Sequence, residues 1–405
     1  MTKTDKEGQR KTPILRFKGF TDDWEQRKLS EMTQQVKRTS DSENPILTIS
    51  AKNGWMDQKD RFNRVIAGKE LKNYIELYKN ELSYNHGNSK YAKFGIIYVQ
   101  RKYEKALVPK VYHSFSMSYG DPRFIENLSL GHKLDKELSK LITSGARQDG
   151  LLNINKKSFY TIKLFTPSEQ EQIKISNIMD VINHVITLYE RKTRLLSKLR
   201  TFLTQRLFSN SSKVSLYFDN KNWSKHKISE FLTERNEKVI PNPSIPLVSF
   251  TVEKGVTPKS KRYNREFLVK DDKKKYKITK KNDIVYNPAN LKFGAIARNK
   301  FGNAAFSPIY VTFITKLNPV FTEFLVRRKD FIKLALKYQE GTVYERMAVK
   351  SKDFLSLKIY LPNSSRDINH IAQILQSLDT LVSLNKNKIS LITLIKKELL
   401  NTMFI

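Results

Sequence analysis

Two long stretches of the chain carry apolar residues at helical spacing. They run from about 168 to 208 and from about 365 to 404. Their apolar residues recur at steps of three and four, which places the side chains on one face of a helix. The stripe of the first stretch contains Ile175, Ile182, Leu196 and Leu203, and that of the second Ile371, Leu378, Asn385, Ile392 and Leu399. The pattern predicts two helices of about 40 residues, each about 60 Å long at the usual rise per residue.

The two predicted helices are expected to pack against each other. Pro167 and Pro362 precede them, and Phe208 and Phe404 close them 196 residues apart, which is 28 heptads. Both stripes therefore have the same heptad phase, and a small domain alone could not bury stripes of this length. We predict one coiled coil formed by both helices. Its helices should run antiparallel, because a pseudo-twofold axis between two duplicated halves would turn one helix against the other.

Polar residues interrupt both apolar stripes near their midpoints. Tyr189 and Lys192 do so in the first stretch, and Asn385 and Lys388 at the same heptad positions of the second. The midpoints of antiparallel helices meet, so these residues are expected to share one layer. Such a layer costs stability and can fix register, although lysines can also extend to solvent.

The rest of the chain is also duplicated. Matching segments include Trp24 and Trp223, Tyr84-Asn85 and Tyr286-Asn287, Phe94-Gly95 and Phe293-Gly294, and Phe159 to Pro167 and Phe354 to Pro362. They combine alternating, strand-like segments with short helical patches. We predict a mixed α/β (α+β) class with two tandemly duplicated domains separated by an antiparallel coiled coil of two long helices. The predicted parts are a flexible N-terminus at 1–14, a first domain at 15–166, a spacer helix at 167–210, a second domain at 211–361 and a second spacer helix at 362–405.

The charge of the chain points to a polyanionic partner. The 405 residues include 74 Lys+Arg and 40 Asp+Glu, which gives a net charge of +34 and a pI near 9.9. Such an imbalance opposes compaction through self-repulsion, so nucleic acid is the first candidate partner and an anionic membrane surface the second. No apolar run approaches the roughly 20 residues of a membrane span, and the first residues lack the apolar core of a signal peptide. We therefore expect a cytoplasmic protein that does not enter a membrane.

The sequence lacks the constellations of common enzymes. There is no cysteine, which excludes disulfides, thiolate metal sites and a cysteine nucleophile. Asn287-Pro288-Ala289-Asn290 lacks the second proline and the aromatic residue of a methyltransferase motif, and turn formation is the simpler interpretation. No phosphate-binding loop occurs, and the six histidines lack metal-ligand spacing. We expect a non-catalytic chain without a metal.

Candidate DNA contacts follow the two Tyr-Asn pairs. They are Asn85, Lys90, Lys93 and Arg101 in the first half and Asn287, Lys292 and Arg298 in the second. Asparagine can pair with adenine in the major groove, and lysine or arginine with guanine or phosphate. The alternative for each asparagine is a turn residue that satisfies local backbone. Tyr84 and Tyr286 are expected to pack in the core rather than contact bases.

Two glycine-containing segments precede the last predicted strand of each half. They supply Arg147 in the first half, and Tyr344 and Arg346 in the second. Glycine permits a close approach of the backbone to a ligand, so these side chains are further candidates for DNA reading. A hairpin turn with an exposed cation explains the same pattern equally well.

The order of these motifs resembles the specificity subunit of type I restriction–modification enzymes. The resemblance rests on Leu15-Arg16-Phe17 with Trp24, the paired Tyr-Asn and Phe-Gly segments, and Pro167 with Glu171-Gln172 before a long helix. It covers nearly the whole chain, and the second copy departs from it with Arg366-Asp367 in place of Glu171-Gln172. The resemblance implies two target-recognition domains that each read half of a split DNA target.

The resemblance also implies partners and cofactors. Helices of this family dock two methyltransferase (modification) subunits, and nuclease/translocase (restriction) subunits then join. S-adenosylmethionine, ATP and Mg²⁺ would be bound by those partner subunits and none by this chain. The alternatives are a basic coiled-coil adaptor for nucleic acid or an anionic surface without sequence-specific readout, and a methyltransferase acting alone. Sequence-specific binding to duplex DNA at moderate salt would exclude the adaptor, because purely electrostatic binding falls steeply with salt. Binding of S-adenosylmethionine by the isolated chain would support the methyltransferase.

Overall fold

The computed structural model of this protein describes residues 11–39, 44–62, 74–142, 151–208, 223–258, 275–340 and 347–405. The chain divides into two compact units. Unit 1 comprises Met1–Glu190 and Asn387–Ile405, and unit 2 comprises Arg191–Lys386. Each unit therefore contains about half of each long helix.

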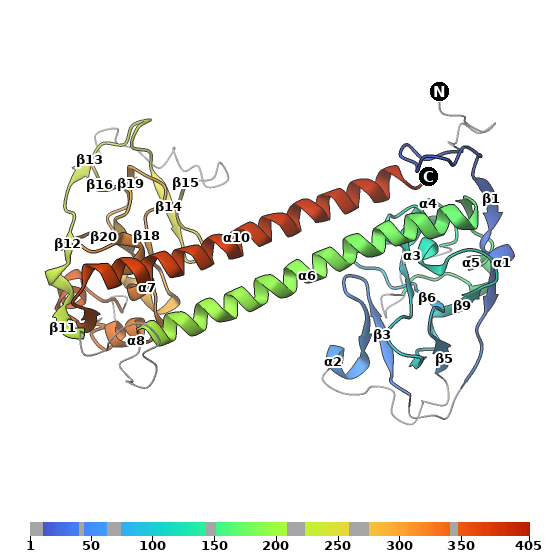
Figure 1. Cartoon of the computed structure of the whole chain (residues 1–405), viewed down its shortest axis with the longest axis horizontal. Coiled ribbons are helices and arrows are strands. Elements are labelled where there is room, and N and C mark those ends of the chain that lie inside the picture. The colour runs from blue at the N-terminus through green and yellow to red at the C-terminus, as the bar shows by residue number, and fades with distance from the viewer. Residues whose placement is uncertain are drawn as a thin grey trace. The chain divides into compact units, whose positions relative to one another are not determined.

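Unit 1 contains short strands and helices followed by the start of a long helix (Figure 1). In chain order they are β1 (Glu25–Lys28), α1 (Leu29–Met32), β2 (Thr33–Gln35), β3 (Leu47–Ser50), β4 (Gly54–Asp57), α2 (Gln58–Phe62), β5 (Ile75–Tyr78), β6 (Leu82–Asn85), β7 (Ile96–Val99), β8 (Lys105–Val108), β9 (His113–Met117), α3 (Pro122–Leu130), α4 (Asp135–Ser139), α5 (Lys156–Phe159), β10 (Lys163–Thr166) and α6 (Glu169–Leu207).

Unit 2 repeats this arrangement with different connections. Its elements are β11 (Trp223–Lys227), η3 (Ile228–Glu230), β12 (Leu232–Glu234), β13 (Lys238–Val239), β14 (Val248–Thr251), β15 (Gly255–Pro258), β16 (Tyr276–Thr279), β17 (Ile284–Tyr286), η6 (Pro288–Phe293), β18 (Ile296–Arg298), β19 (Ala304–Phe306), β20 (Val311–Thr315), α7 (Pro319–Val326), α8 (Lys329–Leu336), α9 (Ser351–Ser356), β21 (Lys358–Pro362) and α10 (Ser365–Thr402).

The same antiparallel sheet occurs once in each unit. Its strand order is β2-β9-β6-β7 in unit 1 and β12-β20-β17-β18 in unit 2. In the register, Tyr84 lies opposite Ile97 and His113, and Tyr286 lies opposite Ile296 and Val311. These strands are mostly buried, as the apolar Tyr-Asn segments predicted. The repeated topology confirms the mixed α/β class and the duplication.

Each unit also pairs its first strand with the strand that precedes its long helix. β1 pairs with β10 and β11 with β21, both antiparallel. Pro167 follows β10 directly, and Pro362 is the last residue of β21. Proline has no backbone N–H and resists continuation of a helix towards the N-terminus, so α6 and α10 each begin within a few residues of it.

The two long helices have the predicted bounds to within a few residues. α6 covers Glu169–Leu207 and α10 covers Ser365–Thr402. The stripe residues that the sequence assigned to the coiled coil are buried or half-buried on both helices. Leu199, Ile374, Leu381 and Ile395 have the same helical spacing but are exposed. The 3.6-residue pattern therefore defines the buried face of each helix only in part.

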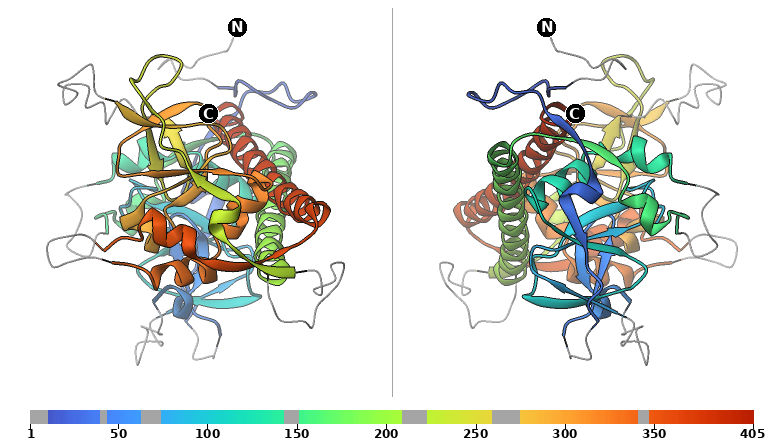
Figure 2. Two further views of the ribbon diagram at one scale, coloured as in Figure 1. Left: turned by 90° about the vertical axis from the view of Figure 1, so that its left-hand side faces the viewer. Right: turned by 90° about the vertical axis from the view of Figure 1, so that its right-hand side faces the viewer.

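Contacts within each unit show that the helices run antiparallel. In unit 1, the Lys388 ammonium nitrogen lies 5.5 Å from the ring centroid of Tyr189. In unit 2, Arg200 Nη1 lies 2.6 Å from Asp379 Oδ1. A later residue of α6 thus faces an earlier residue of α10, and Figures 1 and 2 show the green and red helices side by side. The predicted antiparallel pair is confirmed.

Each long helix ends in a hydrophobic core. Phe404 lies in the core of unit 1, with its ring centroid 5.3 Å from that of Phe124. Phe208 lies in the core of unit 2, 5.2 Å from Phe321. Phe124 and Phe321 occupy the same position of α3 and α7, so the duplication extends to this aromatic pair. The Phe208/Phe404 match in the sequence therefore identifies two equivalent aromatic residues, each of which packs the end of a long helix into a core.

Candidate nucleic-acid interface

Unit 1 has a concave surface whose described lining residues include no Asp or Glu, and we call it the acid-free concavity. It is lined by the β3–β4 turn, α2, the loop after β6 and the loop between β8 and β9. Its polar side chains include Ser50, Lys52, Asn53, Arg61, Asn88 and Tyr91. None of the described residues that line it is Asp or Glu. Amides, cations and hydroxyls in a site without carboxylates can donate hydrogen bonds to phosphates and to the acceptor atoms of bases.

Internal hydrogen bonds hold the walls of the concavity. The Tyr112 hydroxyl lies 3.1 Å from Thr48 Oγ1 and accepts a bond from the backbone N–H of Ile49 at 3.2 Å. Arg61 Nη1 donates to the Ile49 carbonyl oxygen at 2.5 Å. These bonds fix β3 against the neighbouring loops, so the exposed side chains project from a supported frame.

The rim of the concavity is partly aromatic. Tyr91 is 54% exposed, and Lys52 Nζ lies 5.8 Å from its ring centroid. Phe62 and Val111 are also exposed there. Aromatic rings next to donors are common where proteins hold nucleic acid, because rings stack on bases or contact thymine methyl groups.

Asn85, predicted as a base contact, lies in the wall of the concavity. Its Oδ1 accepts a hydrogen bond from Gly87 N at 3.0 Å, and its Nδ2 donates to the Ile49 carbonyl at 3.3 Å. This is the local role that the sequence offered as the alternative. A base contact by Asn85 stays a prediction, and the neighbouring Asn88 is the more exposed amide of the loop.

Steric constraints explain why glycine occupies the second position of the Phe-Gly motif. Gly95 has φ of 78°, and a Cβ at this position would lie 2.6 Å from the Asn85 carbonyl oxygen. A side chain here would therefore displace β6. Lys90 and Lys93 are exposed in the same loop, but they do not line the concavity.

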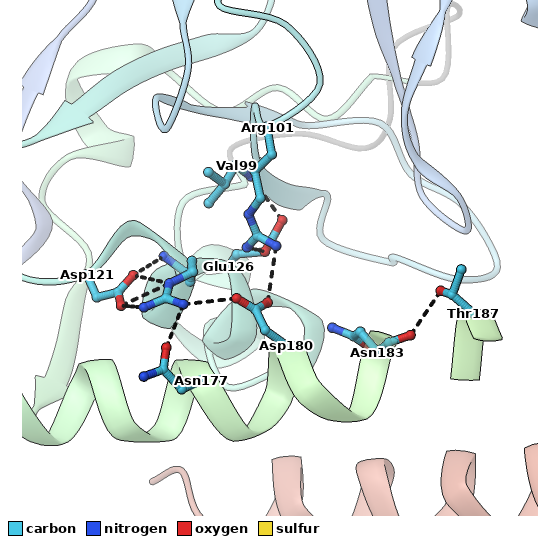
Figure 3. Close-up of polar contacts among 9 residues, drawn as sticks. Val99, Arg101, Asp121, Glu126, Asn177, Asp180, Asn183 and Thr187 are labelled. Atoms are coloured by element: carbon cyan, nitrogen blue, oxygen red, sulfur yellow. Dashed lines mark hydrogen bonds and ion pairs between the residues drawn. The ribbon is translucent and has the colours of Figure 1, made fainter. Parts of the chain in front are cut away.

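Arg101 is bound within unit 1 by two carboxylates (Figure 3). Its Nη2 pairs with Glu126, and its Nη1 lies 3.2 Å from Asp180 Oδ1 on α6. Glu126 also accepts a bond from Val99 N at 3.0 Å. Burial raises the pKa of Glu126, and the Arg101 guanidinium opposes that rise. Arg101 thus links β7, α3 and α6, and a DNA contact by it stays a prediction.

A second arginine, Arg123, adds to these contacts between α3 and α6. Arg123 Nη2 lies 2.6 Å from Asp121 Oδ2, and its Nη1 donates to Asn177 Oδ1 at 2.8 Å and to Asp180 Oδ2 at 3.0 Å. Asp121, Asn177 and Asp180 appear together in Figure 3. The network therefore ties the domain of unit 1 to its half of α6.

In unit 2 the predicted residues have similar local roles. Asn287 caps η6, because its Oδ1 accepts bonds from Ala289 N at 3.1 Å and Asn290 N at 3.3 Å. Arg298 Nε lies 3.1 Å from Glu323 Oε2. Lys292 is exposed beside Phe293, which is 64% exposed. Lys292 is thus available to a ligand, whereas Arg298 already binds a carboxylate.

The two tyrosines that accompany these asparagines belong to the core, as predicted. Tyr84 and Tyr286 are fully buried, and burial raises the pKa of both hydroxyls. The Tyr84 hydroxyl donates to the Phe94 carbonyl at 2.6 Å, and that of Tyr286 to the Val349 carbonyl at 3.0 Å. Arg147, Tyr344 and Arg346 lie outside the described residues.

The concavity contains residues that the sequence analysis did not select. Lys52, Asn53 and Arg61 belong to the β3–β4 turn and α2, and Asn88 and Tyr91 to the loop after β6. The Ala51-Lys52-Asn53-Gly54 run has the composition of a turn, which was the available signal. Nothing in the sequence indicated that this turn meets the loop after β6.

The described part of the chain contains neither a grouped set of metal ligands nor a membrane-spanning helix. Among those residues, no three His, Cys, Asp or Glu side chains are grouped so that they could hold a metal ion. None of the helices within the described ranges has the length and apolar character needed to cross a membrane.

Comparison with known proteins finds solved structures with a similar fold but no protein with a similar sequence. No family model and no curated protein matches the chain. The crystal structure of a type I restriction–modification system S subunit from M. genitalium matches with a TM-score of 0.60 and 14% identity, over 97% of this chain and 99% of that chain.

Two more solved structures align over most of the chain. One, described as the structural basis of complex assembly and conformational transition of the type I R-M system, has a TM-score of 0.50 and 11% identity over 94% of this chain and 97% of that one. The HsdS subunit of Thermoanaerobacter tengcongensis has a TM-score of 0.45 and 11% identity over 94% and 96%. The chain thus has the fold of the M. genitalium S subunit over nearly its whole length.

Proposed function

We propose that this chain is the specificity subunit of a type I restriction–modification enzyme and that it reads a bipartite sequence in double-stranded DNA. The observation that carries the proposal is the duplicated architecture. Each unit has the same four-stranded antiparallel sheet, and the two are joined by an antiparallel pair of long helices. Two domains of one fold with different surface loops are suited to reading two different half-sites.

The charge and the acid-free concavity support the same proposal. A net charge of +34 favours association with a polyanion, and the concavity presents Lys52, Arg61 and several amides without a carboxylate. We assign this concavity to DNA contact in the first half. In the second half, the candidates are Lys292 and the exposed Phe293.

Apolar side chains exposed on the helix pair suggest how partner subunits dock. In unit 1, Val181 and Leu188 of α6 and Leu391, Leu394 and Ile395 of α10 are exposed. Several of them precede a residue of the apolar stripe by one position, which places them beside the contact between the two helices. Exposed apolar clusters of this kind mark protein interfaces.

Unit 2 has an equivalent apolar cluster. It comprises Leu195, Leu199 and Phe202 of α6 and Ile374, Leu381 and Leu384 of α10. Two clusters related by the duplication would accept two copies of one helical partner. We assign that partner as the methyltransferase subunit, and the nuclease/translocase subunits would join the resulting complex.

The chemistry of the complex belongs to those partners. In this proposal the chain binds DNA and positions the methyltransferase subunits, and it forms no catalytic site of its own. S-adenosylmethionine, ATP and Mg²⁺ are then cofactors of the other subunits. A subunit that works on chromosomal DNA is placed in the cytoplasm.

Selection from a library of randomised duplexes tests the proposal. At about 0.15 M salt, the purified chain should enrich two separated, specific half-sites with a fixed spacer. An enrichment of bulk DNA without a motif, with affinity that disappears at this salt, would instead favour the basic adaptor. The variant Lys52→Ala/Arg61→Ala should bind the selected duplex more weakly and with a lower salt slope than the wild-type chain, while Lys157→Ala/Lys163→Ala should not.

A further inference from the structure

Unit 2 contains a second concave surface, which we call the basic groove. It lies between the end of α6, helices α7 and α8, strand β21 and the first half of α10. The cations that line it are Arg200, Arg327, Arg328, Lys329, Lys333 and Lys358. No residue of the predicted DNA-contact set is among the residues that line it.

Each arginine of the groove lies beside a carboxylate of the groove, and one of these carboxylates, Glu323, also pairs with Arg298 and Lys300. The pairs are Arg200 with Asp379 at 2.6 Å, Arg327 with Glu323 at 3.3 Å and Arg328 with Asp330, whose Nε–Oδ1 distance is 3.0 Å. Arg328 Nη1 also donates to the Phe208 carbonyl at 3.3 Å at the end of α6. The arginines thus have structural partners already.

Among the described residues, the three lysines of the groove have no carboxylate partner. Lys329, Lys333 and Lys358 are exposed, and no carboxylate of the described residues pairs with them. They therefore leave an excess of positive charge at the groove, available to an acidic ligand.

The groove also has an apolar part. Phe324, Leu334 and Ile359 are half-buried in its lining, and Tyr360 is exposed there. A phosphate backbone has no apolar groups that would cover these side chains. An amphipathic protein segment with acidic side chains satisfies both the lysines and the apolar part.

We propose that the basic groove binds an acidic amphipathic segment of a protein partner. Part of the lining is specific to one half of the chain. Arg327 and Arg328 correspond to Leu130, the last residue of α3, and Gly131, so these two arginines have no equivalent in unit 1, whereas Lys333 and Lys358 match Lys136 and Lys163. This contact goes beyond the proposed DNA-reading and docking functions, which the duplication gives to both halves.

The test uses the full chain and a defined probe. The probe is a fluorescent 18-residue helical peptide with glutamate on one face and leucine on the other, carrying a photo-crosslinker. At about 0.15 M salt it should crosslink within α7, α8 or β21, and K329E/K333E/K358E should raise its Kd by about tenfold or more. A scrambled peptide of the same composition should bind the wild-type chain more weakly than the amphipathic peptide.

The control variant is matched in charge. In K136E/K157E/K163E the changed lysines are exposed in unit 1, and Lys136 and Lys163 correspond to Lys333 and Lys358. It should bind the peptide as the wild-type chain does. Equal effects of the two triple variants, crosslinks spread over the chain, or displacement of the peptide from the groove by a non-specific duplex would each overturn the proposal. If K329E/K333E/K358E unfolds at a lower temperature than the wild-type chain, the variant K329Q/K333Q/K358Q replaces it, with the same outcomes.

Discussion

Arg16 and Glu171 form a bidentate ion pair, with Arg16 Nε 2.7 Å from Glu171 Oε1 and Arg16 Nη2 2.8 Å from Glu171 Oε2. They are separated by 155 residues, and the Glu171 side chain is 1% exposed. The pair joins the N-terminal Leu-Arg-Phe segment to the first turn of α6. It supplies a physical reason for the joint presence of two motifs on which the family resemblance rests.

Replacing Arg16 should therefore weaken unit 1 rather than DNA contact. Arg16→Ala leaves a buried carboxylate without its partner, and we expect a loss of about 3–5 kcal/mol in the free energy of unfolding of unit 1. Denaturant unfolding measures the loss. The double replacement Arg16→Leu/Glu171→Leu should recover part of it, and an unchanged midpoint in Arg16→Ala would contradict the assigned role.

Arg101 offers a similar test of a predicted DNA contact. Arg101→Met should destabilise unit 1 by about 1–3 kcal/mol, because Glu126 loses its partner; the range is lowered because Arg101 is partly exposed. If Arg101 acts only within the ion pairs that link it to Glu126 and Asp180, the slope of log affinity for DNA against log salt concentration should stay the same. A slope that falls by about one would instead show a phosphate contact.

Lys292 and Arg298 should behave differently in unit 2. Lys292→Ala is expected to weaken DNA binding across sequences and to reduce the salt slope by about one, because the ammonium group is exposed. Arg298→Ala should mainly lower stability, because Arg298 is bound to Glu323. Salt titrations and thermal unfolding of both variants separate the effects, and an unchanged affinity for Lys292→Ala would place that residue away from the DNA.

Unit 1 should lose stability as the pH falls below about 6.5. Burial, together with the nearby His86 and Lys156, lowers the pKa of His113 from 6.5 to about 4. The folded state then binds fewer protons than the unfolded state between these values, so stability is complete above pH 6.5 and is lost as the pH falls towards 4. The total is about 3 kcal/mol at roughly 1.4 kcal/mol per pKa unit.

The variant His113→Gln checks this assignment. Glutamine does not ionise but can still donate to the Ile154 carbonyl, which lies 3.3 Å from His113 Nε2. Its free energy of unfolding should change less between pH 7 and pH 4.5 than that of the wild-type chain. Identical pH profiles would mean that another group dominates.

The length of the helix pair should determine the spacer between half-sites. Inserting four residues between Leu196 and Leu199 adds about 6 Å of helix and breaks the heptad phase. We expect either a longer spacer preference or loss of assembly, with base choice in each half-site unchanged. Binding to duplexes whose spacers differ by one base pair measures this, and full activity at the original spacer would exclude a role of the helices in spacing.

The sequence predicted the long helices well because their stripe is a local, repeated signal. Ile175 and Ile371 could be assigned to a buried face from spacing alone, and Tyr189 and Lys388 to a shared layer from heptad phase. The core role of Tyr84 and Tyr286 also follows from apolar neighbours on short strands. These features depend on periodicity, which one chain displays without any tertiary information.

The candidate site was less predictable because it depends on contacts between distant segments. Lys52 and Tyr91 lie 39 positions apart and become neighbours through the packing of β3, β4 and the loop after β6. Arg101 and Arg298 looked available as DNA contacts, but whether a cation is free depends on carboxylates elsewhere in the fold, here Glu126 and Glu323. Charge along the sequence does not reveal such pairs.

Exchange of one domain tests the central claim most directly. Residues 15–166 would be replaced by the matching domain of another specificity subunit, and the chimaera expressed with the methyltransferase subunit. Methylated sites would then be read by genome-wide methylation sequencing. The account predicts a new sequence in one half of the target, while the other half and the spacer length remain. A change in both halves, or an unchanged motif, would contradict independent reading by two modules.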